Sequence, residues 1–95
     1  MLKVVAKNYV KEENLSEFLN LAQELVLETK KENGSISYNV YQDETNSTIL
    51  TFIEEWQTKE CLNKHLSSKH FTKLIPLMSK LCTKEADMNI YNKLI

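Results

Sequence analysis

The sequence has few of the residues that interrupt or cross-link a chain. Its 95 residues include one glycine, one proline and two cysteines. So little glycine and proline argues against linkers, repeats and low-complexity segments. Cys61 and Cys82 are too few and too far apart for a disulfide framework and lack the spacing of metal ligands, so we expect small buried hydrophobes. A single domain over residues 1–95 is expected.

The sequence also lacks a charge excess and a long apolar run. Its 12 basic and 13 acidic residues give a formal net charge of −1. A field this weak cannot hold a phosphate backbone or an anionic membrane, so neither nucleic acid nor a lipid surface is expected as a partner. No segment reaches the roughly 20 apolar residues that span a bilayer, and residues 1–20 lack a cationic segment followed by an apolar run. A cytoplasmic protein is expected.

Hydrophobic periodicity predicts four strands and three helical segments. Alternating or β-branched apolar residues predict strands over residues 2–10, 35–42, 48–56 and 85–94. Apolar residues at helical spacing predict a helix from Leu15 to about residue 32, a short helix after Thr58, and a third after Ser68 that reaches Cys82. Pro76 removes an amide donor, so the third helix should kink or tighten near residues 72–76.

Helix ends have their own signals. Asn14 is placed to cap the first helix, with Glu17 three residues later as in a capping box. Thr58 and Ser68 are placed to cap the two later helices. Gly34 stands where a left-handed helix end needs a glycine.

The order strand, helix, strand, strand, helical segment, strand predicts an α+β fold. Right-handed crossovers turn it into a ferredoxin-like plait, a four-stranded antiparallel sheet with its helices on one face. The other face would be bare, yet residues 48–56 carry apolar side chains on both sides, with Leu50 opposed to Ile49 and Phe52 opposed to Ile53. A second sheet from an identical subunit is the simplest cover for so small a domain, so we expect a homodimer through the sheet face.

Three short motifs in order resemble one known family. These are E-x-G-x-x-x-Y at Glu32, Gly34 and Tyr38, then E-x-W at Glu54 and Trp56, then H-x4-H-F at His65, His70 and Phe71. Together they resemble the antibiotic biosynthesis monooxygenase domain, whose members are often called quinol monooxygenases, and the similarity covers nearly the whole chain. The resemblance implies a dimeric α+β barrel with a pocket between the sheet and helices of each subunit.

The resemblance also implies an oxidoreductase that uses no flavin, haem or metal. A bound phenol or hydroquinone is deprotonated, its anion reduces dioxygen, and the two radicals recombine before collapse to a quinone. We therefore expect a cofactor-independent monooxygenase whose partners are a small aromatic or quinol-like substrate and dioxygen. The alternative is a non-catalytic or isomerising small-molecule binder of the same fold, and a third is a structural dimer with a closed core.

Three side chains are the candidates for catalysis. Asn8 interrupts an apolar strand face, so its amide either holds a substrate oxygen or bonds to nearby backbone. Trp56 ends its strand and either walls the pocket or packs in the core. His65 falls on the inner face of its helix, where a neutral imidazole either accepts a substrate proton or is a core histidine with a backbone partner.

The remaining candidates are expected to bind substrate. Tyr38 and Tyr41 point to opposite sides of their strand, so one of them faces the pocket. Glu54 lies on an apolar face and should be paired with a helix terminus or His65, or have a raised pKa. His70 lies near the start of its helix, where it either lines the pocket mouth or caps. Phe52 and Phe71 complete the expected set.

Metal and haem sites are not expected. The gap between His65 and His70 predicts different helix faces, and no third ligand has suitable spacing, so no metal is expected. The haem-degrading branch of the family needs an iron-ligating histidine on the last helix. Ile75 occupies that position, and an alkyl chain cannot ligate iron, so haem degradation is not expected.

Overall fold

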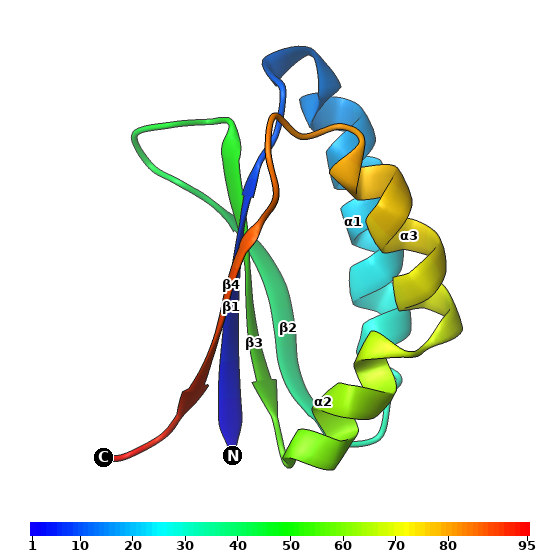
Figure 1. The fold of residues 1–95 in the computed structure, drawn as a ribbon, viewed down its shortest axis with the longest axis vertical. Helices are drawn as coiled ribbons and strands as arrows, with labels where there is room; N and C mark the ends of the chain where they lie inside the picture. Colours follow the sequence, from blue (N-terminus) through cyan, green and yellow to red (C-terminus); the bar gives the residue numbers. More distant parts are fainter.

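The computed structural model describes residues 1–95 and contains one four-stranded sheet with its helices on one face (Figure 1). The helical elements are η1 (Glu12–Asn14), α1 (Leu15–Thr29), α2 (Lys59–Leu66) and α3 (Lys69–Ser79). The strands are β1 (Leu2–Tyr9), β2 (Ser35–Gln42), β3 (Ile49–Trp56) and β4 (Asp87–Asn92). No helix is both long and apolar enough to cross a membrane.

The sheet order is β2-β3-β1-β4, and every neighbouring pair is antiparallel. This is the ferredoxin-like order, so the predicted fold class is confirmed. Figure 1 shows α1 and α3 stacked against one face of the sheet, α2 at the lower end of β3, and no element on the opposite face.

Alternation along β1 and β3 turns every second residue toward the helices. In β3 every second residue from Leu50 to Trp56 is buried, while the residues between them are half-buried. β1 pairs with β3 so that Asn8 lies opposite Leu50 and Val4 opposite Glu54. Asn8 and Glu54 therefore point to the same side of the sheet, the side that the helices cover.

The capping predictions are partly confirmed. The Thr58 side chain accepts a hydrogen bond from the Cys61 amide, and that of Ser68 from the Phe71 amide. Asn14 precedes α1 but makes no side-chain cap, so the predicted capping box with Glu17 is wrong. A 3-10 turn leads into α1 instead, and the side-chain amide of Asn14 (Nδ2) donates to the carbonyl of Leu81, 67 residues away.

α1 ends at Thr29, earlier than the predicted residue 32. The amides of Lys31 and Glu32 bond to carbonyls three residues back, which tightens the chain into a turn. Gly34 closes this turn with a φ of +88°, as predicted from its place after the helix. An added Cβ at Gly34 would lie 2.3 Å from Cys61 Sγ, so this turn packs closely on the first turn of α2.

The last helix and the last strand are also shorter than predicted. α3 continues through Pro76 to Ser79, and Leu81 and Cys82 lie beyond its end, half-buried against the core. Cys82 forms an isolated antiparallel bridge with Val10, the residue directly after β1. The last strand is confined to β4, Asp87–Asn92, because only these residues pair with β1.

Candidate functional site

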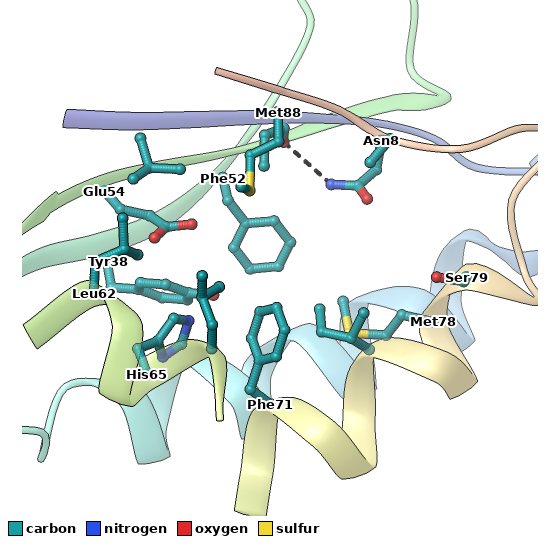
Figure 2. A pocket seen from close by; sticks show the side chains of 15 residues that line it. Asn8, Tyr38, Phe52, Glu54, Leu62, His65, Phe71, Met78, Ser79 and Met88 are labelled. Atoms are coloured by element: carbon teal, nitrogen blue, oxygen red, sulfur yellow. Dashed lines mark hydrogen bonds between the residues drawn. The ribbon is translucent and has the colours of Figure 1, made fainter. Parts of the chain in front are cut away.

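A cavity of about 140 Å³ lies between the covered face of the sheet and the helices α2 and α3 (Figure 2). Eleven of its 15 lining residues are hydrophobic, so a ligand in the cavity would contact mostly apolar side chains. An apolar cavity of roughly 150 Å³ admits benzene. The volume therefore suits one aromatic ring with small substituents.

The four polar lining residues lie in two groups, with Glu54 and His65 at one end of the cavity and Asn8 and Ser79 at the other (Figure 2). The backbone fixes this separation, because Asn8 pairs with Leu50, four residues before Glu54 on β3. Four residues of strand span about 13 Å. A small ring at the Glu54 end is therefore out of direct reach of Asn8.

The end with Glu54 and His65 is the enclosed one. Glu54 and His65 are buried there together with Tyr38 and Leu62. At the other end the lining residues Ser79 and Ala86 are exposed, and so is Met88, which pairs with Ala6 between the two ends. The cavity thus opens between the end of α3 and the start of β4.

His65 is held at the enclosed end by packing and by one strong hydrogen bond. Its side chain is 1% exposed, and its ring centroid lies 4.8 Å from that of Trp56 and 4.9 Å from that of Phe71. His65 Nδ1 lies 2.7 Å from Glu32 Oε2. His65 Nε2 is buried and has no hydrogen-bond partner in the protein.

The Glu32 contact determines which nitrogen of His65 carries the proton. An ionised carboxylate only accepts hydrogen bonds, so His65 Nδ1 must be the N–H that donates to it. In a neutral ring the lone pair is then on Nε2, the unpartnered nitrogen. Burial lowers the pKa of His65, and the Glu32 carboxylate opposes this effect. The ring is therefore a neutral base at neutral pH.

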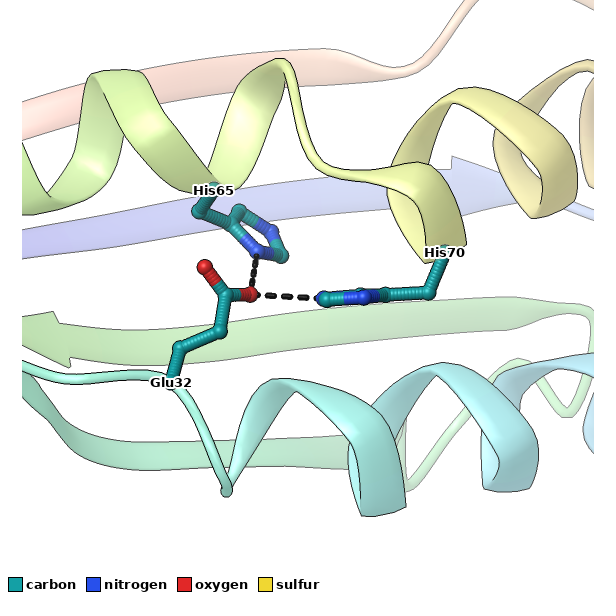
Figure 3. Close-up of side chains that lie close together, drawn as sticks. All are labelled: Glu32, His65 and His70. Atoms are coloured by element: carbon teal, nitrogen blue, oxygen red, sulfur yellow. Dashed lines mark hydrogen bonds and ion pairs between the residues drawn. The ribbon is translucent and has the colours of Figure 1, made fainter.

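Glu32 accepts from His70 as well, so one carboxylate oxygen joins two histidines (Figure 3). His70 Nε2 lies 2.7 Å from the same Oε2, and its side chain is 17% exposed. The expectation that the two rings point apart, with no third ligand beside them, is wrong, because both contact Glu32. They lie on separate helices, α2 and α3, and both rings reach the turn after α1.

These three groups have the composition of a metal site. Atoms of Glu32, His65 and His70 lie within 4.8 Å of one another, and two imidazoles with one carboxylate can bind Zn²⁺ or Fe²⁺. However, both ring nitrogens point at Oε2 itself, at hydrogen-bonding distance. The oxygen thus occupies the point where the ring nitrogens converge, and the arrangement satisfies its own hydrogen bonds without an ion.

Glu54 is bonded to neither predicted partner. Its Oε1 accepts from Trp56 Nε1 at 2.9 Å, so the predicted pairing with a helix terminus or with His65 is wrong. The predicted raised pKa is present, because burial raises the pKa of Glu54 to about 7, an effect that the Trp56 hydrogen bond partly offsets. Burial and, to a smaller extent, the charge of Glu54 raise the pKa of Tyr38, so that phenol stays neutral.

Asn8 combines both roles weighed from the sequence. Its Nδ2 donates to the carbonyls of Ala6 and Leu50, each at 3.2 Å, and its side chain lines the cavity. Both donors are thereby used, so the side-chain oxygen is the group that Asn8 offers to a ligand.

The other candidates divide between the cavity wall and positions behind it. Tyr38, Phe52 and Phe71 line the cavity, as does Ile75. Trp56 is fully buried and does not line it; the indole packs behind His65 and holds Glu54. His70 does not line it either, and its contact is Glu32.

Sequence reasoning missed Glu32 as a member of the site. It stood in the motif with Gly34 and Tyr38, but nothing in its spacing linked it to His65, 33 residues later. Ser79 and Met88 were missed as well. Met88 belonged to the predicted last strand, but nothing in the sequence linked either residue to a cavity.

Comparison with known proteins agrees with this architecture. The profile of the antibiotic biosynthesis monooxygenase family matches residues 1–76. The chain belongs to this family. A relative is the uncharacterised protein sll1783 of Synechocystis, 34% identical over 93% of this chain; the chain spans 60% of that protein's length.

Solved structures place the chain within the antibiotic biosynthesis monooxygenase fold. The crystal structure of a conserved protein from Methanosarcina mazei Go1 is 47% identical with a TM-score of 0.97, covering 98% of this chain and 92% of that one. A crystal structure described as an antibiotic biosynthesis monooxygenase is 30% identical with a TM-score of 0.95, and the match covers 100% of both chains.

Proposed function

We propose that this chain is a cofactor-independent monooxygenase that oxidises a small phenol or hydroquinone with dioxygen. Family membership supports the reaction class, and one observation carries the assignment of the base. His65 Nε2 is buried without a protein partner at a cavity large enough for one ring, while Nδ1 is held by Glu32. This is the arrangement of a general base awaiting a substrate hydroxyl.

The reaction begins with proton transfer. A ring hydroxyl at the enclosed end of the cavity gives its proton to His65 Nε2, and the Glu32 carboxylate stabilises the imidazolium that forms. The electron-rich anion then passes one electron to dioxygen, and the two radicals combine at a ring carbon to form a C–O bond. The apolar walls exclude water during these steps, which protects the radicals from side reactions.

The second supporting feature is the size and polarity of the cavity. Phe52 and Phe71 provide aromatic faces against which a ring can pack, and the polar groups are confined to the two ends. The Asn8 oxygen near the open end accepts a hydrogen bond from any longer polar substituent that reaches it. We therefore expect one-ring substrates, with or without a polar tail, to be preferred over fused polycycles.

Oxygen uptake with a panel of substituted hydroquinones tests the proposal. Wild type should consume oxygen above the autoxidation background, and His65→Gln should lower kcat/KM by roughly 10²- to 10⁴-fold, the usual worth of a general base. Gln keeps a donor for Glu32 but cannot take a proton. Lys64→Ala, on the exposed side of α2, is the matched control and should retain full activity.

Two outcomes would contradict this assignment. Background rates for both wild type and His65→Gln would remove the enzymatic interpretation for those substrates. Saturable binding or thermal stabilisation by a ligand, without oxygen uptake, would favour the non-catalytic or isomerising binder instead.

We also propose that the bare face of the sheet forms a homodimer. Val5 and Ile53 are paired at its centre and are only half-buried in the single chain, and Tyr41 and Tyr91 on the same face are about half exposed. Sedimentation should give a dimer that Ile53→Lys dissociates. Leu27→Lys, an exposed apolar position on α1, is the control and should leave the dimer intact.

A further inference from the structure

Glu54 is the second ionisable side chain at the enclosed end of the cavity. Figure 2 shows its carboxyl group pointing into the cavity from β3, while the His65 ring approaches from α2 on the opposite wall. One carboxyl oxygen accepts from Trp56 Nε1, and the other has no protein partner. Because the indole is fully buried, this bond holds the carboxyl in place with its free oxygen toward the cavity.

We propose that Glu54 is the general acid of the reaction and supplies the proton on which cleavage of the O–O bond depends. This inference rests on the proposed monooxygenase function and adds a second group to it. A base and an acid on opposite walls are what the last step requires.

The chemistry of that step shows why. After the radicals combine and His65 returns its proton to the outer oxygen, the ring carries a C–OOH group on a carbon that also bears hydrogen. His65 removes that hydrogen, the C–H electron pair forms the new C=O bond, and the O–O bond breaks toward the outer oxygen. The balance for a hydroquinone is one hydroquinone and one dioxygen to one hydroxyquinone and one water, with no further reductant.

The leaving group is the difficulty. Without a proton, hydroxide would form in an apolar cavity, where nothing replaces its lost hydration. A proton from Glu54 lets the group leave as water. The water that forms can then carry the proton on His65 back to Glu54, which restores both groups for the next turnover.

Glu54 is suited to this role because about half of it is still protonated at neutral pH. An exposed glutamic acid is almost fully ionised at neutral pH, but burial raises the pKa of Glu54 to about 7. The charge of Glu32 raises it further, and the hydrogen bond from Trp56 lowers it. The other acidic group at this end, the Tyr38 phenol, has its pKa raised by burial and is a poorer donor.

Glu54→Gln under ¹⁸O₂ with unsubstituted hydroquinone tests the inference. Gln keeps the size of the side chain and an oxygen to accept from Trp56, but has no proton to give. Wild type should form hydroxyquinone with one labelled oxygen and little hydrogen peroxide. The variant should form it roughly 10²-fold more slowly and release the consumed oxygen as hydrogen peroxide with unlabelled benzoquinone, because the intermediate then loses its peroxide instead of splitting it.

Glu17→Gln is the control, since Glu17 is an exposed carboxylate in the first turn of α1, outside both the cavity lining and the bare face of the sheet. It should behave as wild type. Labelled hydroxyquinone from Glu54→Gln at the wild-type rate, without extra peroxide, would overturn the role of Glu54 and leave the monooxygenase intact. Background oxygen uptake by wild type would instead remove the proposed function, and this inference with it.

Discussion

Glu32 Oε2 and His65 Nδ1 lie 2.7 Å apart, although 33 residues separate them in the chain. This contact holds the ring at the enclosed end of the cavity and sets its tautomer. It also joins the turn after α1 to α2, so the position of the His65 ring depends on the packing of two elements outside the sheet (Figure 3).

Glu32→Gln should therefore lower activity without removing the base. The Gln amide can present its N–H group to Nδ1, which shifts the ring toward the tautomer that has hydrogen on Nε2 and cannot accept a proton there. We expect kcat/KM to fall by roughly 10²-fold. ¹⁵N NMR of labelled histidine should show the tautomer change at His65. Glu28→Gln, at a carboxylate paired with exposed Lys31, should change neither.

Glu54 should make the protein less stable as the pH rises. Its folded pKa of about 7 lies above the model-peptide value of 4.5, so the folded state binds the proton more tightly than the unfolded state. Stability is then lost between about pH 4.5 and pH 7, by an amount on the order of 3 kcal/mol. Urea unfolding of Glu54→Gln and wild type over this range should show their difference growing in favour of the variant. A difference that does not change with pH would mean that Glu54 is ionised in the folded protein.

Trp56→Phe should raise the pKa of Glu54 above its wild-type value. The indole N–H is the only group that hydrogen-bonds this carboxyl, and the bond favours the ionised form. Carboxyl ¹³C NMR against pH measures the change directly. We also expect a loss of about 1 to 3 kcal/mol in the free energy of unfolding, because a buried acceptor loses its partner. An unchanged titration would show that the indole has no influence on the charge of Glu54.

Gly34→Ala should destabilise the turn that carries Glu32. Its φ of +88° is unfavourable for alanine, and the new Cβ would lie 2.3 Å from Cys61 Sγ and 2.8 Å from Cys61 Cβ. Strain and overpacking together should cost about 2 to 4 kcal/mol in thermal or urea unfolding. In a Cys61→Ala background the cost should be smaller, since only the Cβ contact remains. Equal costs in both backgrounds would assign the whole effect to the backbone.

Removal of metal should leave the reaction unchanged. The two rings already bond to Glu32 Oε2, so the cluster of Glu32, His65 and His70 is complete without an ion. Dialysis against a chelator, followed by metal analysis and oxygen uptake, should show a metal-free protein with full activity. Activity that is lost on chelation and restored by one stoichiometric cation would identify the cluster as a metal site.

The sequence was sufficient for the elements because their signals are local. Alternation showed which residues of β1 and of β3 share a face, and Thr58 and Ser68 marked helix starts that the structure confirms. The same reasoning failed at Asn14, whose amide bonds to a carbonyl 67 residues away. A cap and a long-range contact compete for the same side chain, and only the fold decides between them.

The candidate site was harder, because a site is a set of distances between distant segments. The sequence selected the residue types, and its motifs contain every ionisable group that the structure brings near the cavity. It assigned their contacts wrongly, with Glu54 paired to His65 or a helix terminus and His65 separated from His70. Neither strand alternation nor helical spacing carries information about which loop meets which helix.

The amino-acid order alone determined the α+β class, which residues of each strand share a face, and the family resemblance, because periodicity of 2 or 3.6 residues fixes which side chains share a surface. Only the tertiary structure decided that Trp56 lies behind the cavity, that Glu32 joins two helices through one oxygen, and that a buried nitrogen of His65 has no partner. These facts arise because a turn and two short helices pack together on the sheet. The Glu32 hydrogen bonds join residues that are 33 or more positions apart in the chain, and no local pattern predicts such contacts.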